Sequence, residues 1–202
     1  IANAGDNCTA DSVDFAQDVA ALGVDAIMAV VPYYNKPPQE GLYRHFQTIA
    51  RSVDLPVILY NIPGRSVVNM SAETTLRLAR DVENIVAVKE ASGNLGQIAD
   101  ICHGAPEGFE VLSGNDEDTL PMMGLGATGV ISVVSHVAGL RFKEMVEAQV
   151  SGDHTRAHAA VEGTVRDQQS HHGEESTRTA GIPRGRTTTA AHRGHSRADP
   201  RA

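Results

Sequence analysis

One lysine marks the most reactive position that the sequence predicts. The segment VAVKEASG, Val86 to Gly93, runs from aliphatic residues into Lys89 and then into acidic, small and glycine residues. An amine at the end of a buried strand loses hydration, which disfavours its ammonium form and lowers its pKa. The free amine can then condense with a ketone to form a Schiff base. From these residues alone, a structural lysine paired with Glu90 is an equally good interpretation.

Other polar residues follow apolar runs in the same way. They are Tyr33 and Tyr34, Tyr60 and Asn61, Lys89 and Glu90, residues 113–116, and residues 132–136. Parallel sheets, whether open or closed into barrels, carry their active sites at the carboxyl ends of the strands. The sequence therefore predicts one site that gathers these groups.

Helical and strand patterns alternate along the chain. Helical spacing covers residues 12–22 with Thr9 as N-cap, 40–52, a segment that Ser71 caps and that reaches Ala79, 95–103, 117–125 and 154–165. Apolar strands cover residues 26–31, 56–60, 85–89, 109–112 and 129–134, and the opening residues resemble the end of another strand. Continuous apolar strands are typical of a parallel sheet covered on both faces, so the predicted fold class is α/β.

The spacing of the units favours a barrel over an open doubly wound sheet. Tyr34, Tyr60, Lys89 and Gly114 follow one another at intervals of 25 to 29 residues. The chain also has no glycine-rich dinucleotide loop, which an open sheet of the nucleotide-binding kind would carry. The open sheet remains the alternative.

Composition narrows the function classes. The chain has 202 residues, 41% of them hydrophobic, and a formal net charge of −8, which suits one globular core and argues against binding to nucleic-acid phosphates. Cys8 and Cys102 lack metal or redox spacing and indicate reduced thiols in a cytoplasmic protein. No apolar stretch approaches the ~20 residues of a membrane span.

The last part of the chain differs in composition from the rest. Residues 168–202 carry six arginines against three acidic residues, and Ile182 is their only large aliphatic residue. We predict a domain over residues 1–165 and a disordered, arginine-rich tail over 166–202 that is out of frame or non-native. The alternative is a natural basic arm, which would make the chain a non-enzymatic protein that binds polyanions.

Five motifs together resemble one enzyme family. They are PYYNKPPQEG (Pro32 to Gly41), YNIPGRS (Tyr60 to Ser66), VKEASGN (Val88 to Asn94), LSGND (Leu112 to Asp116) and GVISV (Gly129 to Val133). In this order they are similar to the dihydrodipicolinate synthase and N-acetylneuraminate lyase family, over residues 1–165. The resemblance implies a (β/α)8 TIM barrel, here incomplete: we expect the first two strands and most of the third to be absent, and the C-terminal helical region to be replaced.

The resemblance to dihydrodipicolinate synthases within this family also implies an activity. It is the condensation of pyruvate with L-aspartate 4-semialdehyde to 4-hydroxy-tetrahydrodipicolinate in lysine biosynthesis, by the diaminopimelate pathway. The family works as a homotetramer without a metal or other cofactor. The family loop Gly-Thr-Thr-Gly-Glu, whose second threonine joins the proton relay, has no counterpart here, so we expect impaired activity. The alternative is a pyruvate-dependent aldolase of the same fold that acts on sugar acids or sialic acid.

The same resemblance assigns roles to single residues. Lys89 would form the Schiff base, Tyr60 would shuttle protons, and Tyr34 would reach across a dimer interface into the neighbouring site. Arg65 would hold the carboxylate of the aldehyde substrate, because its planar guanidinium can form two hydrogen bonds to a carboxylate. An arginine at this position favours aspartate semialdehyde over sugar acids as the substrate. Without the resemblance, Tyr60 reads as a barrel-rim aromatic, Tyr34 as loop packing and Arg65 as a solvent-facing side chain.

Two softer groups of residues complete the implied site. Gly114 and Ile131 match positions whose backbone contributes to the pyruvate pocket, although Ile131 alone would read as plain core. Asn7, Asp11 and Tyr33 lie where the family binds lysine as a feedback inhibitor. Asp11 replaces the glutamate that is more usual in the family, so the sequence leaves open whether lysine regulates this chain.

Overall fold

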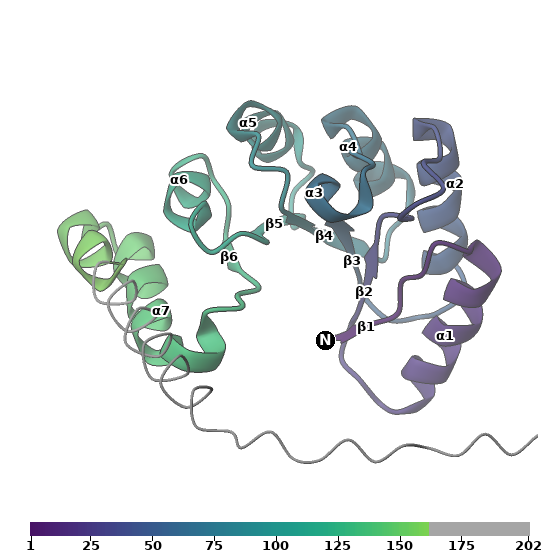
Figure 1. The fold of residues 1–202 in the computed structure, drawn as a ribbon, viewed down its shortest axis with the longest axis horizontal. Helices are drawn as coiled ribbons and strands as arrows, with labels where there is room; N and C mark the ends of the chain where they lie inside the picture. The colour runs from purple at the N-terminus through teal and green to yellow at the C-terminus, as the bar shows by residue number, and fades with distance from the viewer. Residues whose placement is uncertain (162–202) are drawn as a thin grey trace, which may run out of the picture. The chain divides into compact units, whose positions relative to one another are not determined.

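Six parallel strands form the centre of the fold in the computed structural model, which describes residues 1–161 (Figure 1). The strands are β1 (Ala2–Asn3), β2 (Ile27–Val30), β3 (Val57–Asn61), β4 (Ile85–Glu90), β5 (Glu110–Ser113) and β6 (Gly129–Val130). They lie in the sheet in chain order, and each pairs in parallel with the next. Such regular β–α–β succession confirms the predicted α/β class.

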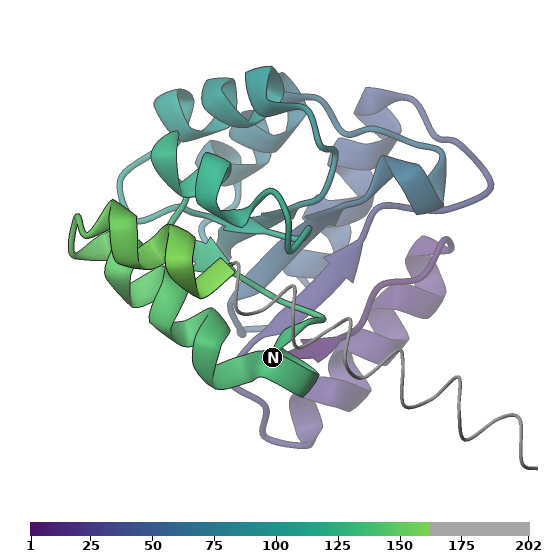
Figure 2. The ribbon, with the colours of Figure 1, turned by 60° about the vertical axis from the view of Figure 1, so that its left-hand side comes forward.

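Helices follow the strands and pack along the outer side of the curled sheet, as the view turned by 60° also shows (Figure 2). They are α1 (Thr9–Ala21), α2 (Gln39–Ala50), α3 (Pro63–Ser66), α4 (Ala72–Asp81), α5 (Leu95–Gly104), α6 (Thr119–Gly124) and α7 (Ser135–Val150). Residues 154–161 are helical as well. The curled sheet with outer helices is an incomplete (β/α)8 barrel, as predicted.

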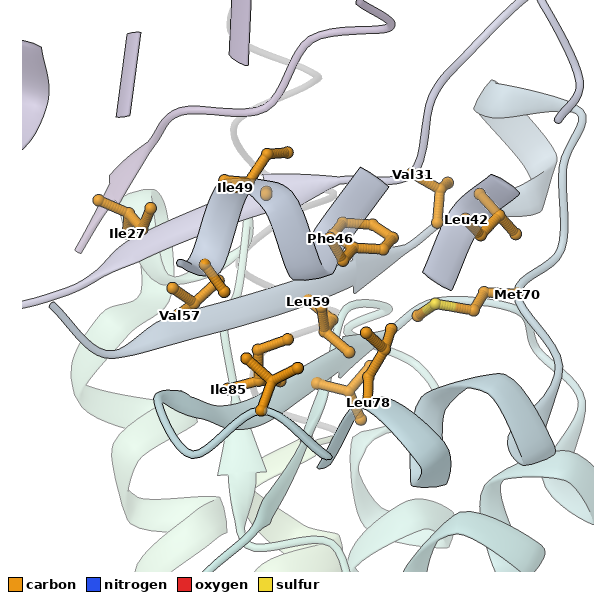
Figure 3. Close-up of a cluster of buried hydrophobic side chains, with 14 of the residues drawn as sticks. Ile27, Val31, Leu42, Phe46, Ile49, Val57, Leu59, Met70, Leu78 and Ile85 are labelled. Atoms are coloured by element: carbon orange, nitrogen blue, oxygen red, sulfur yellow. The ribbon is translucent and has the colours of Figure 1, made fainter. Parts of the chain in front are cut away.

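The hydrophobic core lies between the sheet and these helices (Figure 3). Leu42, Phe46 and Ile49 recur at helical spacing in α2, so one face of the helix is apolar. They pack in one cluster with Leu59 of β3 and Leu78 of α4, and all five are fully buried. Each such side chain stabilises the fold by about 1.5–3 kcal/mol relative to an exposed one.

One of two predicted helix caps is confirmed. Ser71 precedes α4, and its hydroxyl oxygen accepts a hydrogen bond of 3.2 Å from the backbone N–H of Thr74. The prediction for Thr9 was wrong, because α1 already begins at Thr9 and Cys8 occupies the N-cap position. The hydroxyl of Thr9 instead lies 2.9 Å from Nδ1 of His45 on α2.

The last strand is shorter than the sequence pattern predicts. β6 ends at Val130 and not at residue 134, because the chain turns into α7. The N–H groups of Val133 and Val134 donate to Oδ2 of Asp116, at 3.2 and 3.1 Å, and so cannot continue the sheet. Neither α7 nor the single-turn α3 was among the predicted elements.

The other predicted elements agree with the structure to within a few residues. The predicted helix over 154–165 is present as far as the described residues reach. Residues 162–165 and the predicted tail over 166–202 lie outside the described residues, so the domain boundary stays a prediction. No helix in the described part of the chain is long and apolar enough to cross a membrane.

Candidate active site

Two neighbouring strands bring Lys89 and Tyr60 together. β3 and β4 pair in a register that places Tyr60 opposite Lys89. Side chains directly opposite one another in a sheet project from the same face, here the face away from the helices. Nζ of Lys89 lies 4.1 Å from the centre of the Tyr60 ring. The amine therefore lies against an aromatic ring at the carboxyl end of the sheet.

The environment of Lys89 favours its uncharged form. The residue is only 7% exposed, and burial lowers the pKa of its amine, which agrees with the expectation from the sequence. The negative charge of Asp116 acts in the opposite direction but is the smaller effect. A lysine whose pKa is lowered in this way holds more of the free amine near neutral pH, which is the form that attacks carbonyl groups.

The alternative reading of Lys89, as the partner of Glu90, does not fit the geometry. The two residues are consecutive in β4, so their side chains point to opposite faces of the sheet. Within residues 1–161 no ion pair joins them, and Glu90 accepts its hydrogen bonds from Asn61, Ser92 and Gln97.

Gly114 makes room for the lysine. A Cβ atom at this position would lie 3.1 Å from Cε and 3.2 Å from Cγ of Lys89, and 2.8 Å from Cβ of Ala91. Any side chain here would press on the stem of the lysine, because contacts below about 3.4 Å are repulsive for carbon atoms. The glycine after β5 therefore lets the lysine lie flat against the end of the neighbouring strand.

The backbone N–H groups of Gly114 and Ile131 are already used within the fold. Gly114 donates to the carbonyl of Glu90 at 2.8 Å, and Ile131 donates to the carbonyl of Ser113 at 3.0 Å. A carboxylate bound at these residues could not take either hydrogen without breaking a bond of the sheet. The structure therefore occupies both N–H groups; the contact with the Lys89 side chain gives Gly114 a steric part in the site, and Ile131 continues from β6 beside the end of β5.

Arg65 approaches Tyr60 from the short helix α3. Pro63 occupies the first turn of α3, where its missing N–H costs no hydrogen bond, and the chain leaves the helix through Val67 in a left-handed conformation. Burial raises the pKa of the Tyr60 hydroxyl, whereas the positive charge of Arg65 lowers it. The arginine is exposed, so its guanidinium is available to an anion from solvent.

Tyr34 lies apart from this group. It is 86% exposed on the loop after β2, and its φ of 73° lies in the left-handed region that few non-glycine residues adopt. The ring extends into solvent and does not cover Lys89 or Tyr60. The predicted part of Tyr34 in a neighbouring subunit's site therefore stays a prediction.

Two of the three residues predicted for lysine regulation, Asn7 and Tyr33, form a second group after the carboxyl ends of β1 and β2. Nδ2 of Asn7 donates to the carbonyl of Tyr33 at 3.2 Å, and the Tyr33 hydroxyl donates to Oδ2 of Asp6 at 3.0 Å. This bond lowers the pKa of Asp6 and raises that of Tyr33. Asp11 is exposed in the first turn of α1. Asn7 and Tyr33 therefore meet, and Asp11 forms no bond with either.

The sequence analysis gave no role to Asp6, and it included Asp116 only as the last residue of the polar group over residues 113–116. The structure places Asp6 beside Tyr33 and brings the charge of Asp116 to act on Lys89. Asp6 follows β1 as the other site residues follow their strands, and this signal could have found it. Oδ1 of Asp116 is buried without a hydrogen-bond partner, while its charge acts on Lys89. Within residues 1–161, no cluster of three or more histidine, cysteine or acidic residues could hold a metal ion.

Comparisons with known proteins match most of the chain. The sequence profile of the Dihydrodipicolinate synthetase family matches residues 1–168. A 4-hydroxy-tetrahydrodipicolinate synthase from Symbiobacterium thermophilum is 56% identical over 159 residues, which cover 79% of this chain and 54% of that protein.

Two solved structures share the fold. A dihydrodipicolinate synthase from Cyanidioschyzon merolae, solved with lysine bound, matches with a TM-score of 0.75 and 46% identity. A chloride-inhibited dihydrodipicolinate synthase from Acinetobacter baumannii, complexed with pyruvate, matches with a TM-score of 0.75 and 39% identity. Each match covers 78% of this chain and 54% of the solved chain, so the chain spans about half the length of these relatives.

Proposed function

This chain belongs to the dihydrodipicolinate synthetase family, and we propose that it carries the pyruvate-binding half of a 4-hydroxy-tetrahydrodipicolinate synthase site, with Lys89 as the Schiff-base residue. The observation that carries this proposal is the buried Lys89 amine, 4.1 Å from the centre of the Tyr60 ring, at the carboxyl end of a parallel sheet. The pyruvate complex of the A. baumannii relative supports the choice of ketone.

The proposed reaction begins at the amine of Lys89. It attacks the ketone carbon of pyruvate, water leaves, and a protonated imine forms. Transfer of a proton from the methyl group to water gives a neutral enamine. The enamine carbon attacks the aldehyde carbon of L-aspartate 4-semialdehyde, which restores the protonated imine. The aldehyde oxygen takes up a proton, which the Tyr60 hydroxyl would deliver. The amino group of the semialdehyde then attacks the imine carbon, which closes the ring and releases Lys89.

Arg65 is the proposed group for substrate choice. Its guanidinium is exposed beside Tyr60, where it can form two hydrogen bonds to the carboxylate of the semialdehyde. An aldolase for sugar acids would instead need groups for hydroxyls at this place. A comparison of turnover with aspartate semialdehyde and with hydroxylated aldehydes separates these two substrate classes.

The proposed function includes an oligomer and a regulatory site. Tyr34, exposed on its left-handed loop, would complete the proton relay of a neighbouring subunit in a homotetramer. Asn7, Asp11 and Tyr33 would bind lysine, and the C. merolae relative, solved with lysine bound, supports a test of lysine binding. The enzyme would act in the cytoplasm, in lysine biosynthesis.

Reductive trapping tests the proposed function. The chain is incubated with pyruvate and sodium borohydride, and each lysine peptide is examined by mass spectrometry. We expect Lys89 to gain the mass of pyruvic acid less one oxygen atom, while Lys36 and Lys143, the only other lysines, stay unmodified. Lys89→Arg keeps the charge and should abolish the adduct. A folded chain that gives no adduct, or gives it equally on all three lysines, contradicts the proposal.

A further inference from the structure

A second cross-strand pair directly follows Tyr60 and Lys89. The next residues along β3 and β4, Asn61 and Glu90, are also opposite one another. Because side chains alternate along a strand, this pair projects from the helix side of the sheet, behind the amine and the phenol. Both residues are fully buried. The two pairs therefore share one short piece of backbone but face opposite sides.

The carboxyl group of Glu90 is held by hydrogen bonds from three residues. Nδ2 of Asn61 lies 3.1 Å from Oε1 and 3.0 Å from Oε2. The N–H of Ser92 donates to Oε1 at 2.8 Å, and Nε2 of Gln97 donates to Oε2 at 3.3 Å. A buried carboxyl group is costly unless such donors surround it, so this arrangement is expected only where the group has a task or a fixed structural place.

The same residues bind two further segments. Oδ1 of Asn61 accepts from the N–H of Met70 at 3.0 Å, and Nδ2 of Asn69 donates to Oε1 of Gln97 at 2.8 Å. The network thus connects the ends of β3 and β4, the loop before α4 and the start of α5. Tyr60 and Lys89 lie on two of these segments, and α3, which carries Arg65, is placed between Asn61 and Asn69 in the chain.

We propose that Asn61 and Glu90 are positioning residues that fix the Lys89 amine against Tyr60 for imine formation. The inference rests on the proposed function and adds the groups that set its geometry. A sideways shift of β4 against β3 would move Lys89 and Glu90 together, because they are consecutive in one extended strand. Hydrogen bonds are directional, so the Asn61–Glu90 pair resists this shift in a way that apolar contacts do not. Displacements below 1 Å already slow reactions between positioned groups.

Variants that reverse the direction of the Asn61–Glu90 hydrogen bond distinguish a positioning role of this pair from a role in burial alone. Asn61→Asp places two acidic groups face to face. Glu90→Gln replaces one of the two oxygens that accept from Nδ2 of Asn61 by an NH2 donor. The double variant Asn61→Asp/Glu90→Gln again sets one donor opposite one acceptor, with the direction reversed. Asn84→Asp is the matched control: Nδ2 of Asn84 donates to the carbonyls of Ala50, Val53 and Leu55 at the amino end of the strands, far from the amine.

Two readouts are taken on each folded variant. The first is the rate of reductive trapping with pyruvate on Lys89. The second is the pH at which Lys89 is half acetylated by acetic anhydride, with Lys36 and Lys143 as internal references. The groups that face Lys89 are Tyr60 and Asp116, and neither is changed in these variants.

We expect both single variants to trap pyruvate about tenfold more slowly. Their acetylation midpoint for Lys89 should move up by about half a pH unit or more, because water reaches the amine when the strand ends separate. The double variant should return both readouts towards those of the parent chain, and Asn84→Asp should lower stability without changing either. Gln97→Ala, at a half-buried position, should change the trapping rate and the acetylation midpoint in the same direction as the single variants but by less. If a single variant does not fold, Gln97→Ala serves as the test in its place.

Three outcomes would overturn the proposal. They are single variants or Gln97→Ala that match the parent, a double variant no better than the poorer single one, and an Asn84→Asp effect on Lys89 as large as theirs. If the parent chain itself is not trapped by pyruvate, the proposed function is what fails. The acetylation midpoints still decide the positioning role, because they do not depend on pyruvate.

Discussion

Gly114→Ala is the smallest change that should disturb the site. The added Cβ would lie 2.8 Å from Cβ of Ala91, and 3.1 and 3.2 Å from Cε and Cγ of Lys89. Gly114 does not lie in the left-handed region, so alanine can adopt its backbone conformation without strain. Any effect of the substitution therefore comes from these three contacts.

The loss of stability in Gly114→Ala depends on how far the neighbouring side chains can shift. The stem of Lys89 is flexible and can shift by a few tenths of an ångström, but the methyl group of Ala91 is fixed to the backbone after β4. One added methyl group in a packed site costs about 1–3 kcal/mol. We therefore expect the free energy of unfolding to fall by about 1–2 kcal/mol, and imine formation at Lys89 to slow about tenfold because the amine is displaced.

Two measurements on Gly114→Ala, each compared with a control substitution at another glycine, check this prediction. Urea unfolding followed by circular dichroism gives the loss of stability, and reductive trapping with pyruvate gives the rate at Lys89. Gly139→Ala in α7 is the control, since a Cβ there meets no atom within 4 Å and should leave the rate unchanged. Gly114→Ala with the parent's stability and rate would refute the steric role of this glycine.

Three further predictions follow from single contacts. Burial lowers the pKa of His45 from 6.5 to about 4, so between these pH values the unfolded chain binds a proton that the folded chain does not. The free energy of unfolding should therefore fall by roughly 1 kcal/mol per pH unit from pH 6.5 towards pH 4. His45→Gln should remove this contribution to the slope in unfolding experiments across that range. Ser71→Ala deletes the acceptor for the N–H of Thr74 and should lower the free energy of unfolding by about 1 kcal/mol, whereas an unchanged value would mean that water replaces the cap. Asp116→Asn removes the charge that favours the ammonium form of Lys89, so half-acetylation of Lys89 should occur at lower pH, and a midpoint that rises would contradict the assigned interaction.

The strands and the reactive lysine were predictable because their signals are local. Val86 to Gly93 carries both the apolar run that makes β4 and the polar residues that end it, and the partner strands repeat this pattern. A parallel sheet then places all carboxyl ends at one edge, so the meeting of Lys89 with Tyr60 follows from the fold class without knowledge of any contact.

The features that sequence reasoning missed depend on partners far away in the chain. β6 ends at Val130, and Asp116 accepts hydrogen bonds from the N–H groups of residues 133 and 134. Nothing in the sequence of those two valines indicates this distant partner. The hydrogen bond between Asn61 and Glu90 joins residues 29 positions apart on the helix side of the sheet. The last four residues of β4 are buried on both faces, so the pattern there has no alternation that could show which way Glu90 points.

The order of the strands has a consequence for how this part of the chain folds. Every strand of the sheet pairs with its immediate neighbours in sequence, so no pairing has to wait for a segment made much later. Each new β–α unit therefore adds to a surface that already exists. During synthesis on the ribosome, the strand that carries Tyr60 can therefore be in place before Lys89 emerges, and the lysine adds to a template that is already formed.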